Sequence, residues 1–268
     1  MGLIPPILLN YLFPSPSSWF VATMTVVNFY SVTSAGYNEA KGGNMPYSKF
    51  SNVGVAKKQE KKLSSRNGML LFYAPSFLVG LASFFIFPLR DLRFVLLASA
   101  LTIHFFKRVL EVLFLHKYSG SMALRSAIII PLSYTSSTAT MIYALYLSQD
   151  FTEPTVDLKY VGITLFLIGT IGNFYHHYLL ANLRKKGDKT YKIPQGGLFR
   201  LIICPHYLFE IVAYVGISTI SQTPYAVSFT LATIFYLMGR SYGTRKWYLS
   251  KFGEEFPKEV KALIPYVF

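Results

Sequence analysis

The sequence predicts an all-α integral membrane protein, a bundle of about seven transmembrane helices with a cytosolic C-terminus. Two observations lead to this prediction. Of the 268 residues, 52% are hydrophobic and only 14% are charged, whereas soluble domains carry about a quarter charged residues. The apolar residues also gather in long windows separated by short basic segments, as expected of helices that cross a bilayer.

Seven windows are apolar enough to span a membrane, at 17–36, 68–88, 93–116, 124–148, 158–182, 198–221 and 224–249. The first window lacks the basic flank and the small-residue cleavage site of a signal peptide, so we expect a retained helix. No internal repeat or low-complexity stretch separates the windows. We therefore treat residues 1–268 as a single membrane domain.

The connecting segments predict the orientation of the bundle. Segments 38–67 and 183–192 are rich in lysine and arginine, and the tail adds Arg245, Lys246, Lys251, Lys258 and Lys261, whereas residues 1–16 contain neither. The segment after the fourth window is acidic, with Asp150, Glu153 and Asp157 against Lys159, and the link Gln222–Thr223 carries no charge. Basic segments favour the cytosol. Their alternation predicts a luminal start and a cytosolic C-terminus.

The net charge of +14 does not by itself exclude any class of partner. In a soluble protein it would suggest nucleic acid, but no basic nucleic-acid motif accompanies it, and cations between apolar windows suit lipid headgroups. We predict no nucleic-acid partner. Cys204 is the single cysteine, so an intrachain disulfide is excluded.

The third window contains four strongly polar residues on one helical face. His104, Lys107, Arg108 and Glu111 follow one another at i, i+3, i+4 and i+7. Polar groups at membrane depth are costly and are functional candidates by default. A purely structural ion pair through Glu111 is one interpretation. The other is that the surplus positive charge stabilises a phosphate or a developing oxyanion.

The fifth window ends in a second polar face, formed by Asn173, His176 and His177. A histidine pair can bind metal, but neither an HExxH pattern nor a carboxylate or thiol at ligand spacing accompanies this one. We therefore predict hydrogen bonds to a ligand and no metal.

The sixth window contains Pro205, His206, Tyr207 and Glu210. Because proline removes a backbone donor, we expect the helix to bend at Pro205. A phenol beside cations in a low-dielectric site can donate a proton, which makes Tyr207 a candidate acid. A tyrosine hydrogen-bonded only for packing is the alternative.

Two further segments carry weaker signals. Arg240, Thr244 and Tyr248 share a face of the last window, where an interfacial aromatic belt is the alternative reading. Between the fifth and sixth windows, the loop from Tyr191 ends in Gly196-Gly197, whose backbone N–H groups suit a phosphate. GxGxxG and Walker patterns are absent from the sequence, so any nucleotide would bind without a Rossmann domain.

Several ordered motifs give the chain a family resemblance. GNFYHHYLLANLRKKGDKTYKIPQGGLF is followed by CPHYLFE, GRSYGTRKWYLSKF and FPKEVKALIPYVF. This series resembles the C-terminal domain of the steroid 5-alpha-reductase family. Within that family, IHFFKRVLEVLFLHKYSGSM at 103–122 is most similar to the trans-2-enoyl-CoA reductases of very-long-chain fatty acid elongation.

The resemblance implies an endoplasmic-reticulum membrane enzyme that uses NADPH to reduce a C=C bond conjugated to a carbonyl. It divides the chain into variable substrate-side helices (1–100) and a catalytic domain (101–268). Lys107, Arg108 and Tyr207 become the catalytic residues. By the same resemblance, the cofactor site comprises His116, Asn173, Arg184, Tyr191, Lys192, His206, Glu210, Arg240 and Tyr248. Four further residues are expected to contact the substrate or to support the residues that do, namely Tyr73, His104, Glu111 and His177.

Departures from the family pattern bear on the substrate. Tyr73 and Phe105 stand where steroid-reducing members carry a Glu and a Tyr, which argues against a steroid; His206 and His177 also depart from the family's usual residues. We expect a very-long-chain enoyl-CoA as the lipid substrate, and membrane lipids and other elongation enzymes as partners. The alternatives are a steroid or polyprenol-type reductase, an isoprenylcysteine-type methyltransferase and a non-catalytic scaffold.

Overall fold

The computed structural model describes residues 6–50, 61–87, 91–118, 120–183 and 190–268. Within these ranges the chain forms seven α-helices, as the windows predict. They are α1 (Trp19–Ala40), α2 (Ser65–Ile86), α3 (Leu92–Leu110), α4 (Leu124–Tyr146), α5 (Lys159–Asn182), α6 (Pro205–Ser221) and α7 (Pro224–Phe252). By length and composition, α2 and α4 are the two described helices that qualify as membrane spans.

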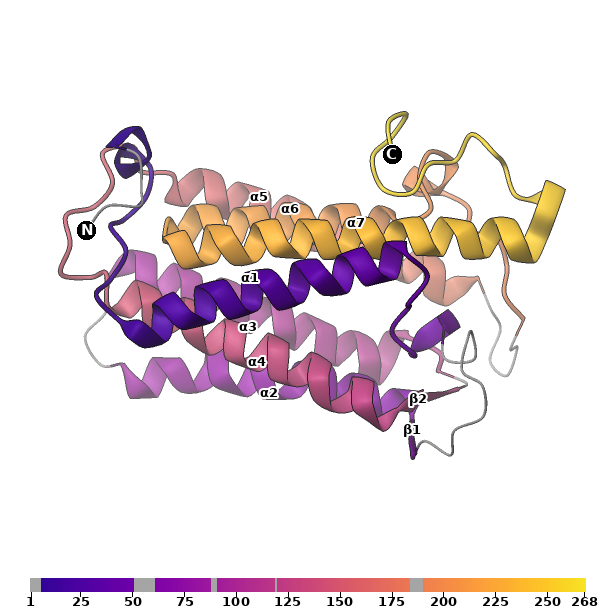
Figure 1. Ribbon diagram of the computed structural model, residues 1–268, viewed down its shortest axis with the longest axis horizontal. Coiled ribbons are helices and arrows are strands. Elements are labelled where there is room, and N and C mark those ends of the chain that lie inside the picture. The colour runs from indigo at the N-terminus through magenta and orange to yellow at the C-terminus, as the bar shows by residue number, and fades with distance from the viewer. Residues whose placement is uncertain (1–5, 51–60, 88–90, 119, 184–189) are drawn as a thin grey trace.

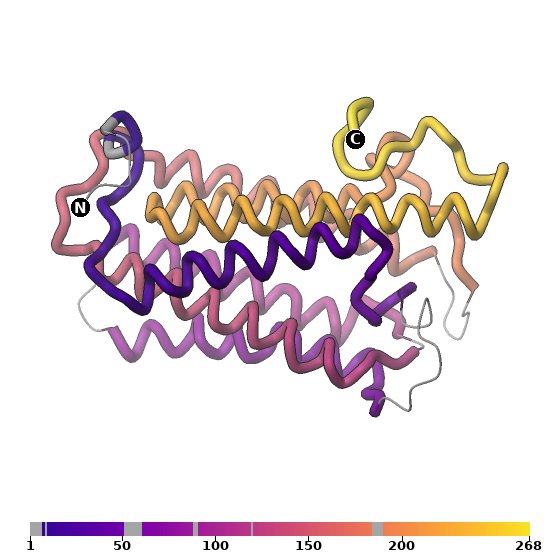
Figure 2. The backbone as a smooth tube through the Cα atoms, viewed as in Figure 1, coloured from indigo at the N-terminus to yellow at the C-terminus, as the bar shows by residue number. Residues whose placement is uncertain are grey.

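The helices run roughly along one axis, with α5, α6 and α7 on one side, α2, α3 and α4 on the other, and α1 across the front (Figure 1). The start and end of the chain lie at opposite ends of the bundle, as an odd number of helices requires (Figure 2). We call the end that holds the C-terminus the basic end, because the lysine-rich connections were predicted there.

Glycine allows the closest helix pairs to form. A Cβ on Gly239 of α7 would lie 1.9 Å from the carbonyl oxygen of Gly36 on α1. On α5, a Cβ on Gly169 would lie 2.3 Å from the backbone nitrogen of Ala213 on α6. Small residues permit such backbone approach between helices. The α1–α7 and α5–α6 pairs are accordingly the most extensive helix contacts in the bundle.

The connections at the basic end contain structure that the windows did not predict. Strands β1 (Lys62–Ser64) and β2 (Ser121–Ala123) pair antiparallel, with Lys62 opposite Ala123. A π-helical turn, Glu111–Leu115, continues α3, and short 3-10 turns occupy Ser48–Phe50, Gly197–Arg200 and Gly253–Glu255. A further 3-10 turn, Pro6–Asn10, lies near the start of the chain.

The bend expected at Pro205 is wrong. Pro205 is the first residue of α6, and the 3-10 turn Gly197–Arg200 before it is a separate element. The first helical position lacks an intrahelical N–H partner in any case, so proline begins a helix there without cost.

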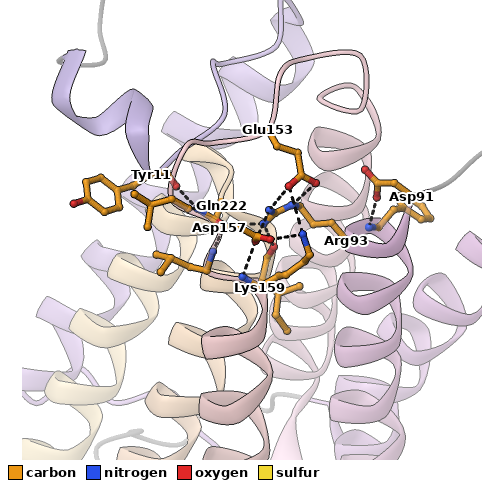
Figure 3. A network of polar contacts seen from close by, with 11 residues as sticks. Tyr11, Asp91, Arg93, Glu153, Asp157, Lys159 and Gln222 are labelled. Atoms are coloured by element: carbon orange, nitrogen blue, oxygen red, sulfur yellow. Dashed lines mark hydrogen bonds and ion pairs between the residues drawn. The ribbon is translucent and has the colours of Figure 1, made fainter.

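A buried arginine closes the opposite end of the bundle (Figure 3). The Arg93 side chain is fully buried and donates to Glu153 Oε2 at 3.0 Å, Asp157 Oδ1 at 2.8 Å and Gln222 Oε1 at 2.7 Å. Gln222, in the left-handed region with φ 48°, donates to the carbonyl of Tyr11 at 2.6 Å. One network thereby joins α3, the acidic segment, the α6–α7 link and the N-terminal segment.

Candidate functional site

A cavity of about 260 Å³ opens among the helices near the basic end. Its walls come from α2, α3, α4, α5, α6 and α7, from the segments after α3 and α5, and from the connection after α1. The predicted site residues that line it are Tyr73, Arg108, His116, His177, Tyr191, Lys192, His206, Tyr207, Glu210, Arg240 and Tyr248. The structure therefore brings together residues that lie up to 175 positions apart in the sequence.

Four other predicted residues lie behind this wall. Lys107, Glu111 and Asn173 support lining residues rather than line the cavity themselves. His104 is buried in the core between the rings of Phe105 and Tyr214. Arg184 lies outside the described residues.

Glu111 is the centre of the polar face predicted on the third window. Its carboxylate accepts from Arg108 Nη1 at 2.5 Å and from Lys107 Nζ at 3.0 Å. His177 Nδ1 lies 3.0 Å from the same carboxylate. Glu111 has only 1% of its side chain exposed, so this charge is held by cations rather than by water.

Arg108 extends from Glu111 into the cavity. Its Nη2 donates to the hydroxyl of Tyr73 at 2.5 Å, and its guanidinium carbon lies 4.5 Å from the centre of that ring. Glu111 fixes one edge of the guanidinium and Tyr73 the other. The Arg108 guanidinium is therefore held in a fixed orientation where it reaches the cavity.

Asn173 joins three helices behind the wall. Its amide nitrogen donates to Glu210 Oε2 at 3.1 Å and to the carbonyl of His206 at 2.8 Å, and its amide oxygen accepts from Lys107 Nζ. The Lys107 ammonium is thereby committed to Asn173 and Glu111. The structure thus places Lys107 as a support for α5 and α6, one step removed from the cavity.

Arg240 has a partner that the sequence did not reveal. Its Nη1 donates to both carboxylate oxygens of Glu39, on α1, at 2.8 and 2.9 Å, and both side chains are 1% exposed. The guanidinium also lies over the rings of Tyr47 and Phe50, at 4.2 and 4.3 Å. Arg240 therefore holds the segment after α1 against the cavity.

That segment supplies a cation that the sequence analysis missed. Lys49 lines the cavity, and its Nζ lies 5.2 Å from the centre of the Tyr248 ring. Burial lowers the pKa of Lys49 to about 8, and the nearby positive charge of Arg240 contributes to the same shift. In the sequence, Lys49 is only one of several lysines in a basic connector, and nothing there marks it as a site residue.

His116 follows the π-helical turn and faces His177, with ring centres 5.1 Å apart. A neutral imidazole at this position can donate one hydrogen bond and accept another.

Glu111, His116 and His177 place one potential metal-ligand atom each within 4.8 Å of one another. The sequence shows no carboxylate at ligand spacing from His176 and His177; the fold brings Glu111 to His177 from a different segment. However, Arg108 Nη1 lies 2.9 Å from His177 Nδ1 and 2.5 Å from Glu111 Oε2. A guanidinium within the cluster opposes a second cation there.

Tyr207 follows Pro205 on the first turn of α6 and lines the cavity. Its ring lies 4.2 Å from that of His206. Among the described residues its hydroxyl has no hydrogen-bond partner, so the proton can be offered to a ligand.

The loop between α5 and α6 is held by His176. The His176 Nδ1 donates to the carbonyl of Gly172 at 2.7 Å, and Nε2 accepts from the backbone nitrogen of Leu198 at 3.2 Å. The ring also stacks on Phe209, with centres 5.2 Å apart. The backbone N–H of Leu198 is thus occupied by an imidazole, whereas the phosphate contact expected of the Gly196 and Gly197 N–H groups stays a prediction.

The wall carries a clear charge bias. Among the described residues, five cationic side chains line the cavity against one carboxylate, Glu210; they are Lys49, Arg108, Lys117, Lys192 and Arg240. Arg108 is paired with Glu111 and Arg240 with Glu39. Excess positive charge in a water-poor cleft concentrates anionic ligands.

A family model described as 3-oxo-5-alpha-steroid 4-dehydrogenase matches residues 127–268. The chain belongs to the 3-oxo-5-alpha-steroid 4-dehydrogenase family. The match begins in α4 and includes all of α5, α6 and α7, so it contains His177, Tyr207 and Arg240 but not Arg108 or Lys49.

Similar proteins in this family carry two kinds of name. The chain is 32% identical over 167 residues to a very-long-chain enoyl-CoA reductase of Dictyostelium discoideum, covering 62% of this chain and 55% of that protein. It is 40% identical over 107 residues to a steroid 5-alpha-reductase of Gossypium hirsutum, covering 40% and 42%. It is 38% identical over 125 residues to 3-oxo-5-alpha-steroid 4-dehydrogenase 1 of Homo sapiens, covering 47% of each. The chain thus spans about half the length of these relatives.

Proposed function

We propose that this protein is an NADPH-dependent reductase of the endoplasmic-reticulum membrane that acts on a very-long-chain trans-2-enoyl-CoA. The observation that carries the proposal is the cationic cavity with a free phenol, Tyr207, at the basic end of the bundle. Membership in a family of reductases and similarity to a very-long-chain enoyl-CoA reductase support the reaction type.

The wall fits a dinucleotide with phosphates. Lys49, Lys117 and Lys192 offer ammonium groups, and His116 and Tyr191 offer rings and hydrogen bonds. When bound, NADPH supplies the hydride that is added to the β-carbon of the double bond. The segment after α1 covers this part of the cavity because Glu39 and Arg240 hold it in place, which restricts entry of water.

The protein's own residues stabilise the negative charge of the enolate and supply the proton for the α-carbon. We assign Arg108 to the negative charge that develops on the carbonyl oxygen as the enolate forms, because its guanidinium is fixed in advance by Glu111 and Tyr73. We assign the Tyr207 hydroxyl to protonation of the α-carbon, after which its oxygen regains a proton from solvent. Lys107 acts as a positioning residue through Asn173 and Glu111.

A steroid is the second candidate substrate, because two of the similar proteins are steroid reductases at 40% and 38% identity. The structure offers limited polar support for it. Phe105 is 1% exposed and packs against Tyr134 rather than facing the cavity. The hydroxyl of Tyr73 is the polar group left at that position, and it already accepts from Arg108.

The test is oxidation of NADPH by the purified full chain, offered a long-chain trans-2-enoyl-CoA or a 4-ene-3-oxosteroid. We expect turnover of the thioester, and a loss of roughly 100-fold or more in kcat for Tyr207→Phe. Tyr178→Phe, on the outer face of α5 and 49% exposed, is the matched control and should remain active. Full activity of Tyr207→Phe would refute the assigned role, and turnover of the steroid alone would refute the substrate.

A further inference from the structure

A second, separate depression lies on the outside of the bundle at the basic end. Its volume is about 430 Å³, and it is lined by Lys61, Leu124, Arg125, Ile128 and Ile129. Among the described residues it shares none with the site cavity. We call these five residues the α4 groove.

The two cations of the α4 groove are held side by side by the backbone. Lys61 directly precedes β1, and its carbonyl accepts from the backbone nitrogen of Leu124 at 3.0 Å. Arg125 is the next residue along α4. Two charges about 60 positions apart are thereby fixed at one rim, and among the described residues neither forms an ion pair.

The rest of the groove is apolar and continues along the helix. Ile128 and Ile129 are 49% and 40% exposed, and Leu132, one turn further, is 64% exposed. From Arg125 to Leu132 the helix rises about 10 Å. The groove thus has a cationic rim and an apolar track as long as several methylene groups, and no carboxylate of the described part of the chain lines it.

We propose that the α4 groove binds one anionic phospholipid, with its phosphate at Lys61 and Arg125 and an acyl chain along Ile129 and Leu132. Charge complementarity selects this occupant. A free phosphate would use the rim alone, whereas a zwitterionic lipid would bring its own cation to the same place. Since α4 is one of the helices apolar enough to span a membrane, its basic end lies at headgroup level.

The experiment uses the full chain in phosphatidylcholine nanodiscs doped with phosphatidylglycerol, released into native mass spectrometry. We expect one phosphatidylglycerol to be retained preferentially. Each surface cation contributes about one kcal/mol to anionic-lipid binding, so Lys61→Ala with Arg125→Ala should weaken retention by roughly 30-fold. Arg200→Ala with Lys258→Ala, two exposed cations outside the groove, is the matched control and should leave retention unchanged.

Two further measurements keep the result unambiguous. Ile129→Asn should weaken retention while both cations remain, and glycerophosphoglycerol, the headgroup without chains, should fail to compete. Equal losses in the two double variants would overturn the proposal in favour of diffuse charge. Full competition by the headgroup would overturn it in favour of a phosphate site. Thermal unfolding in pure phosphatidylcholine verifies that every variant is folded.

Discussion

The affinity for NADPH should depend on pH through Lys49. Burial lowers the pKa of this side chain to about 8, so in the free protein the ammonium is mostly charged at neutral pH and mostly neutral above pH 8. A bound phosphate favours the charged form and raises the pKa again. Binding above pH 8 therefore requires uptake of a proton, and affinity falls as pH rises.

The magnitude follows from the same pKa. If the bound ammonium stays charged, the dissociation constant grows with the neutral fraction of the free protein, by roughly tenfold between pH 7 and pH 9. Titration of NADPH against the fluorescence of Trp247, beside Lys49, measures it. Lys49→Arg, which remains charged, should remove the pH dependence. A flat profile in the unmodified protein, or an unchanged tenfold fall in Lys49→Arg, would refute this reasoning.

Three other substitutions test the architecture. Glu39→Gln leaves a buried guanidinium without its counter-charge and should cost about 3–5 kcal/mol of unfolding free energy; a loss below about 1 kcal/mol in chemical denaturation would contradict the pairing. Gly197→Ala places a Cβ 2.7 Å from His176 Nε2 at φ 48° and should raise the KM for NADPH. Gly253→Ala is the control, because φ is 54° there and no atom lies within 4 Å, so the substitution adds backbone strain without a new contact. An equal rise in KM in Gly253→Ala would show that the contact with His176 is not the cause. Arg93→Met should lower the melting temperature but leave the KM for NADPH unchanged, because Arg93 lies at the start of α3, whereas the cavity lies near the end of that helix.

The sequence predicts the parts of this structure that depend on local periodicity. The seven helices follow from apolar windows, and the cluster at Glu111 follows from the i, i+3 and i+4 spacing of Lys107 and Arg108. These interactions stay within one helix turn or two, so their geometry is set by helical pitch.

The missed features all depend on partners from distant segments. In the sequence, Glu39 is an acidic residue in the basic connector after the first window, yet it neutralises Arg240, 201 positions away. Lys49 is one of many lysines until the fold places it against Tyr248. The proximity of Glu111 to His177 likewise exists only because α3 and α5 meet. Spacing along the chain contains no information about such pairs.

The most direct test of the central claim is the fate of the hydride. The full chain should be incubated with a long-chain trans-2-enoyl-CoA and NADPH carrying deuterium at the transferable position, and the saturated product analysed by mass spectrometry. The account predicts one deuterium at the β-carbon and a solvent proton at the α-carbon, with product formation lost in Tyr207→Phe. Deuterium at the α-carbon, or no saturated thioester despite binding of NADPH, would contradict it.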